Sequence, residues 1–267
     1  MIYILIAAAI VLILTAAFFL ENKRIHVTHT VIAHEKVNHG FTVVQVSDLH
    51  NVSFGQNQER LIREITEAKP DSILVTGDLF NRKRKKACKN SFAFVREAVK
   101  ICPVFFAEGN HECALTETGE EYIDSIRKMG VIVLRDEFID LPEYRLIGLR
   151  QYASLETLSA MLSEHSLNVV MAHRPELFPI YAGTGADVIL SGHAHGGQIR
   201  IRRRGLYAPQ QGFFPRYSEG IYRSGKSLMF VSRGLGNTIP VPRIFNTPEL
   251  CVISFEPAEK RKEKEYV

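Results

Sequence analysis

Apolar runs recur along this chain at short intervals, and the first of them differs from the rest. Residues Ile2 to Leu20 contain no charged side chain. A helix of this length would measure about 28 Å, close to the ~30 Å hydrocarbon thickness of a bilayer. No Lys or Arg precedes the run, so it is not typical of a cleaved signal peptide. The pattern therefore predicts a single-pass transmembrane anchor over residues 1–21.

The charges after this run predict an orientation. Lys23 and Arg24 follow it directly. The positive-inside rule then places the rest of the chain in the cytoplasm, with an extracytoplasmic location as the alternative. Residues 22–40 are polar and rich in His, Thr and Asn, and we expect a linker and a first strand there.

From Phe41 onwards, short apolar runs alternate with segments of helical spacing. We expect strands over 41–46, 72–76 and 103–107, and helices over 61–69, 92–101 and 120–129. This alternation is typical of a layered α/β domain.

The second half of the chain has shorter apolar runs and tighter connections. We expect a helix over 155–163 and strands over 131–134, 138–141, 144–149, 168–172, 188–190, 227–232 and 250–255. Residues 258–267 are mostly charged, and a disordered tail is expected there. Residues 41–257 then form one domain, which is large enough to bury a sizeable core.

Composition narrows the class of protein without deciding it. Hydrophobic residues make up 46% of the 267 residues and charged residues 23%, which is ordinary for a globular protein. A net charge of +4 is too small to indicate nucleic acid binding, and no specific nucleic acid partner is expected. The four cysteines form no CxxC pair, so free thiols are favoured over a structural zinc site.

Five polar motifs each follow an apolar run that we expect to be a strand. They are Asp48-Leu49-His50, Gly77-Asp78, Gly109-Asn110-His111-Glu112, His173 and Gly192-His193-Ala194-His195. Because loops at the carboxyl ends of strands converge on one crevice in such folds, the motifs can meet in space. Oxygen and imidazole ligands without thiolate suit two divalent metal ions, with Mn²⁺, Fe and Zn²⁺ all open.

A centre of two metal ions has a definite chemistry. One aspartate can bridge ions about 3.5–4 Å apart, and the ions convert water into a bridging hydroxide that attacks a phosphoryl group at neutral pH. A histidine outside the ligand set can then protonate or stabilise the departing alkoxide. Each motif alone is weakly specific, whereas the ordered set is strongly specific.

The ordered motifs resemble the series D-x-H, G-D, G-N-H-[D/E], H and G-H-x-H of the calcineurin-like metallophosphoesterase superfamily. The resemblance runs from Phe41 to Phe255. Within the superfamily, Gly192–Gln198 and Ser232–Gly236 are similar to the bacterial membrane-anchored phosphodiesterase-like branch. The resemblance implies a four-layer α/β/β/α sandwich of two mixed sheets flanked by helices.

The resemblance also implies a role for each motif residue. One metal ion would be held by Asp48, His50 and His195. The other would be held by Asn110, His173 and His193, with Asp78 as the bridge. His111 would be the catalytic acid or charge stabiliser at the leaving group. No ligand of the pattern is missing, which favours an active enzyme over a metal-binding scaffold.

Two basic clusters follow motif loops. They comprise Arg82 to Lys86 with Lys89, and Arg200 with Arg202, Arg203 and Arg204. A solvated loop and a rim that attracts phosphate or an anionic membrane surface are both open for each cluster. The candidate rim residues are Arg82, Lys83, Arg84, Arg200 and Arg202.

The sequence therefore predicts a membrane-anchored phosphoesterase that hydrolyses a phosphodiester. A lipid-linked substrate, such as a UDP-diacylglucosamine-like pyrophosphate, is one hypothesis. A nucleotide or phosphomonoester hydrolase on the same site is the enzymatic alternative. The non-enzymatic alternative is a membrane-tethered metal-binding scaffold or interaction protein. The sequence makes no prediction of oligomeric state.

Overall fold

The structure is a computed structural model that describes residues 22–83, 88–201, 204–238 and 243–258, together with residues 3, 5 and 6. Within these residues the chain forms two six-stranded mixed sheets. The first sheet has the order β1 (His26–His34), β16 (Glu249–Pro257), β2 (Phe41–Val46), β3 (Ser72–Thr76), β4 (Val104–Ala107) and β5 (Ile132–Val133). The second has the order β14 (Gly220–Ser224), β15 (Ser227–Val231), β9 (Val188–Ser191), β8 (Asn168–Met171), β7 (Arg145–Gly148) and β6 (Glu137–Asp140).

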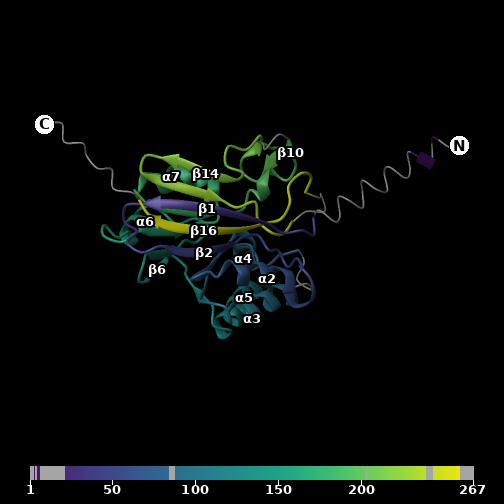
Figure 1. Cartoon of the computed structure of the whole chain (residues 1–267), viewed down its shortest axis with the longest axis horizontal. Coiled ribbons are helices and arrows are strands. Elements are labelled where there is room, and N and C mark those ends of the chain that lie inside the picture. The colour runs from purple at the N-terminus through teal and green to yellow at the C-terminus, as the bar shows by residue number, and fades with distance from the viewer. Residues whose placement is uncertain are drawn as a thin grey trace.

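Helices cover the outer face of each sheet. The first sheet carries α2 (Glu59–Ala68), α3 (Lys89–Ala98) and α5 (Glu117–Lys128), which gather on one side of the molecule (Figure 1). The second sheet carries α6 (Leu155–Met161) and α7 (Phe178–Gly183). Shorter elements are α4 (Asn110–Cys113), η1 (Gln56–Gln58), η3 (Pro175–Leu177) and η4 (His195–Gly197).

The layers follow from the two-residue period of the strands. In β3 and β4, the register partners Leu74 and Phe105 point into the apolar cluster between the two sheets. Their neighbours Ile73 and Val104, also partners, point into the cluster beneath α2, α3 and α5. Strands covered on both faces are apolar on both faces, which is why they read as continuous apolar runs. The expected α/β/β/α layering is present.

Several elements differ from the sequence prediction. Helix α3 begins at Lys89 rather than 92. The pattern also does not predict β14 or two short hairpins, β10 (Arg200–Ile201) with β11 (Arg204–Gly205) and β12 (Tyr207–Ala208) with β13 (Gly212–Phe213). Strand β1 lies within residues 22–40, where the sequence predicts a first strand, and it pairs in parallel with β16. The charged tail lies outside the described residues from 259 onwards.

The predicted membrane anchor is not supported. Among the residues that the structure describes, no helix is long and apolar enough to cross a membrane. Most of the apolar run of residues 2–20 lies outside them, because only its residues 3, 5 and 6 are described. The prediction rested on the hydropathy of the run alone. On this finding the predicted membrane location is wrong, and neither a transmembrane anchor nor an orientation set by Lys23 and Arg24 is supported.

Candidate metal centre

The five motifs lie at the carboxyl ends of β2, β3, β4, β8 and β9. Strands β2, β3 and β4 are parallel neighbours in the first sheet, and β8 and β9 are parallel neighbours in the second. Hydrogen bonds join the two sheets at this end, because the backbone N–H of His193 donates to Asp48 Oδ2 at 3.0 Å. The ends of both sheets therefore meet at one place.

The first group of side chains comprises Asp48, His50 and His195, all buried. Asp48 Oδ1 lies 3.7 Å from His50 Nε2 and 3.6 Å from His195 Nε2. The two Nε2 atoms are 3.4 Å apart. One carboxylate oxygen and two imidazole nitrogens thus face a common point.

The second group comprises Asp78, His173 and His193, again all buried. His173 Nε2 lies 3.3 Å from Asp78 Oδ2 and 3.2 Å from Asn110 Oδ1. Asp78 Oδ2 is also 3.6 Å from His50 Nε2. Asp78 therefore lies between the two groups, at the position of a bridging ligand.

These residues fit divalent metal ions. His173 Nδ1 lies 2.8 Å from the carbonyl oxygen of Thr76, which can only accept a hydrogen bond, so Nδ1 carries a proton. In the neutral ring, Nε2 then presents a lone pair to two other acceptors, Asn110 Oδ1 and Asp78 Oδ2. Acceptors that face one another in a buried site repel unless a cation lies between them. Imidazole with carboxylate and amide oxygen is a suitable ligand set for that cation.

The pKa shifts of Asp78 and His173 also indicate a site that favours a cation. Burial raises the pKa of Asp78, but the nearby His173 and His50 outweigh burial and hold it well below its usual range. Burial lowers the pKa of His173, but the charge of Asp78 outweighs burial and raises it to about 10. The position between these two side chains therefore favours positive charge.

Residues 41–197 match the family model described as calcineurin-like phosphoesterase, which is more than half of the chain. The chain belongs to the calcineurin-like phosphoesterase family. This confirms the superfamily resemblance, and the family generally binds two divalent metal ions. The match does not show the membrane-anchored branch.

Curated bacterial relatives agree with the family. An uncharacterized metallophosphoesterase of Campylobacter jejuni is 27% identical over 80% of this chain, which spans 59% of that protein's length. The uncharacterized metallophosphoesterase YkuE of Bacillus subtilis is 28% identical over 90% of this chain and 88% of its own. Phosphodiesterase YaeI of Escherichia coli is 29% identical over 70% of this chain and 71% of its own.

Backbone conformation orients the side chains of the candidate metal centre. Five of the expected ligand residues have a positive φ although none is glycine: Asp48, His50, Asp78, His193 and His195. Such left-handed conformations cost of order 1–3 kcal/mol each and cluster at functional sites. The turn at each strand end thus points its side chain into the centre instead of continuing the strand.

Glu112 ties two motif loops together. Its carboxylate accepts hydrogen bonds from the backbone N–H groups of Asp78, Phe80 and Gly109 at 2.8–2.9 Å. Burial and the adjacent charge of Asp78 raise the pKa of Glu112 to about 8. The acidic residue that closes the GNHE motif therefore positions the loop that carries Asp78.

His111 lies against the first group. Its ring meets that of His50 edge-on, with centroids 4.7 Å apart, and its backbone N–H donates to Asp78 Oδ1 at 2.8 Å. The backbone N–H of Arg82 donates to Nδ1 at 3.2 Å, so the neutral ring carries its proton on Nε2. Burial, together with nearby positive groups, lowers the pKa of His111 to about 4.

Two contributors to the centre carry no local sequence signal. Asn246 Nδ2 donates to the carbonyl oxygen of His195 at 2.7 Å. The fully buried guanidinium of Arg243 donates to the carbonyl oxygen of Arg233 at 2.8 Å and lies 3.4 Å from His195 Nδ1. Both follow the motifs by about fifty positions, in a segment without apolar periodicity.

The predicted basic rim is only partly where it was expected. Arg82 and Lys83 are exposed beside His111, whereas Arg84 and Arg202 lie outside the described residues. Arg200 is 4% exposed and ion-paired with Glu219. Its guanidinium also donates to the carbonyl oxygen of Gly196 at 2.9 Å. Arg200 therefore stabilises the fold locally and does not present a free charge at a rim.

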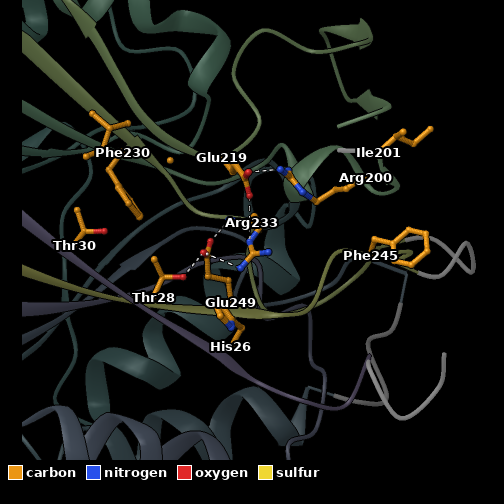
Figure 2. A pocket seen from close by; sticks show the side chains of 12 residues that line it. His26, Thr28, Thr30, Arg200, Ile201, Glu219, Phe230, Arg233, Phe245 and Glu249 are labelled. Carbon is orange, nitrogen blue, oxygen red and sulfur yellow. Dashed lines mark hydrogen bonds and ion pairs between the residues drawn. The ribbon is translucent and has the colours of Figure 1, made fainter. Parts of the chain in front are cut away.

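Arg200 instead lines a separate cavity of about 850 Å³ (Figure 2). Strands β1 and β14, one edge strand of each sheet, contribute residues to its walls. A chain of charges crosses it, in which Arg233 pairs with both Glu219 and Glu249. None of the seven expected metal ligands lines this cavity.

Proposed function

We propose that this chain hydrolyses a phosphodiester at a dinuclear metal centre. The observation that carries the proposal is the convergence of seven oxygen and nitrogen side chains at one buried end of both sheets. They are Asp48, His50 and His195 for one ion, Asn110, His173 and His193 for the other, and Asp78 for both.

The residues divide the chemical work. Two divalent ions bound here would supply Lewis acidity and a nucleophile from water at neutral pH. Asp78 joins the two ligand groups through Oδ2, while its Oδ1 is fixed by the N–H of His111. His111 is the catalytic residue beside them, because its Nε2–H can donate to a phosphoryl or leaving-group oxygen. Exposed Arg82 and Lys83 would attract the anionic substrate.

A diester is preferred over a monoester because one related protein is named a phosphodiesterase. A nucleotide or phosphomonoester hydrolase uses the same residues and is the alternative outcome of the test below. The hypothesis of a membrane-tethered scaffold depended on the anchor, which the described part of the chain does not support.

The apolar part of the substrate is a finer proposal. The hypothesis of a lipid-linked substrate depended largely on the membrane anchor, which the described residues do not support. What supports an apolar substituent is a set of exposed apolar side chains on the two hairpins that follow His195: Ile201, Tyr207, Phe213 and Phe214. Exposed apolar groups that gather beside a site are typical of ligand contact.

Hydrolysis by the full chain tests the proposal. The protein is stripped with a chelator, supplied with Mn²⁺, and assayed with bis-p-nitrophenyl phosphate and with p-nitrophenyl phosphate. We expect faster turnover of the diester, and loss of both activities in Asp78→Asn, with folding checked by circular dichroism. Turnover no greater than in Asp78→Asn with any of Mn²⁺, Fe²⁺ or Zn²⁺ would contradict the proposal, and faster monoester turnover would favour the alternative.

A further inference from the structure

We propose that Gln210 is a positioning residue that selects the nitrogen with which His193 binds a metal ion; this rests on the proposed dinuclear centre. Gln210 Oε1 lies 2.5 Å from His193 Nε2. Because an amide oxygen only accepts hydrogen bonds, this contact places the proton of the neutral ring on Nε2. Nδ1 is then left with the lone pair that a metal requires.

The fold holds Gln210 against His193 from outside the motifs. Gln210 lies in the turn between β12 and β13, and its φ of 58° is left-handed. The residue that leads into this hairpin is held on the loop that carries His193, because the N–H of Leu206 donates to the carbonyl oxygen of Gly197 at 3.0 Å. A Cβ at Gly197 would come within 2.3 Å of Gly205 Cα. Strand β11, which precedes the hairpin, therefore approaches the loop as closely as two glycine backbones allow.

The neighbouring Gln211 holds the same turn through the backbone of Tyr217. Its side chain donates to the carbonyl oxygen of Tyr217 at 2.8 Å and accepts from the N–H of Tyr217 at 2.9 Å. The two adjacent glutamines thus have different partners. Gln211 contacts the backbone of Tyr217, and Gln210 contacts His193 in the candidate metal centre. This separation provides a matched control.

The other histidine of the same ion shows why such a partner matters. The ring of His173 is oriented by the carbonyl oxygen of Thr76, which holds the proton on Nδ1 and turns Nε2 inward. His193 lies against it, with ring centroids 5.0 Å apart, and Gln210 does for His193 what Thr76 does for His173. Partners that orient metal-bound histidines typically contribute 10–100-fold to metal affinity.

Titration of the metal-free full chain with Mn²⁺, followed by calorimetry, tests this without any substrate. We expect two ions per wild-type chain. In Gln210→Ala one ion should bind 10–100-fold more weakly, while the other binds as before. Gln210→Glu, which keeps an acceptor for Nε2–H, should restore most of the affinity. Gln211→Ala should leave both affinities unchanged.

Each contrary result is distinguishable. Two ions bound by Gln210→Ala with wild-type affinity would overturn the role of Gln210. An equal loss in Gln211→Ala would also overturn it, since the effect would then come from seating of the hairpin. A wild-type chain that binds no Mn²⁺ would instead contradict the metal centre itself. Because Gln210 lies on an exposed turn, its replacement leaves the core intact.

Discussion

At the scale of single residues, the candidate ligands are packed so closely that the motif glycines have no room for a side chain. A Cβ at Gly109 would lie 2.1 Å from Asp78 Oδ1 and 2.5 Å from the backbone nitrogen of Asp78. A Cβ at Gly192 would lie 1.9 Å from Ser47 Oγ. The glycines of the GD, GNHE and GHAH motifs thus let separate strand ends approach closely enough for the candidate ligands to meet.

Gly109→Ala should abolish most of the activity with little change in fold. The added methyl group displaces Asp78 from its place between the two ligand groups, and a displacement of about 1 Å costs on the order of 100-fold in rate. Turnover of bis-p-nitrophenyl phosphate and Mn²⁺ binding are the measurements. Gly183→Ala is the control, because a Cβ there meets nothing within 4 Å. Wild-type turnover in Gly109→Ala would show that the loops tolerate the displacement.

At the scale of elements, a stack of rings joins the two sheets. Phe41 of β2 stacks on Phe255 of β16 and on Tyr144, which precedes β7, with centroids 4.6 Å apart in both pairs. The hydroxyl of Tyr144 lies 2.8 Å from Ser72 Oγ at the start of β3. The stack and this contact therefore align β2 and β3, whose opposite ends lead to the candidate ligands Asp48 and Asp78.

Phe41→Ala should lower the free energy of unfolding by about 3–5 kcal/mol, the usual cost of removing a buried phenyl group. Urea unfolding followed by circular dichroism measures it. Phe214→Ala provides the comparison, because its ring is 71% exposed and its loss should cost about 0.5 kcal/mol or less. Equal costs for the two substitutions would mean that the stack does not hold the sheets together.

Some elements and site residues could be predicted from the sequence, and others could not. Strands 41–46 and 72–76 are found to the residue, because each is a buried apolar run followed at once by a polar motif. Strand β14 is largely exposed and has no apolar run to reveal it. Gln210 and Arg243 follow no such strand, and only the packing of distant segments brings them to His193 and His195. Local periodicity predicts elements and motif ligands, whereas the groups that orient those ligands depend on tertiary contacts.

At the scale of the whole molecule, a chain of charged side chains connects β1 with β14, one edge strand of each sheet. Glu249 of β16 accepts hydrogen bonds from Thr28 of β1 and from Arg233, which follows β15. Arg233 also pairs with Glu219, just before β14. Figure 2 shows these side chains in sequence across the cavity. Strands β1 and β14 are thus connected through Glu249, Arg233 and Glu219, and Glu249 is the buried carboxylate of this chain of charges.

That carboxylate should make stability depend on pH. Burial raises the pKa of Glu249, but Arg233 and the hydrogen bonds to the carboxylate outweigh burial and lower it. The folded pKa then lies below the unfolded value of about 4.3. The unfolded chain therefore binds more protons in the interval between the two values. The stabilisation is complete above about pH 4.3 and is lost as the pH falls through the folded pKa.

Urea unfolding of the wild type and of Glu249→Gln between pH 3 and 7 measures this contribution. Glutamine keeps the shape of the side chain and loses its charge, so the variant should be less stable near pH 7. The gap between the two proteins should narrow as the pH falls from about 4.3 to the folded pKa, because the unfolded wild-type chain then binds a proton that the folded carboxylate does not. Other acidic groups titrate in both proteins and cancel in the difference. A gap that stays constant over this range would mean that the ion pair with Arg233 does not connect the two sheets energetically.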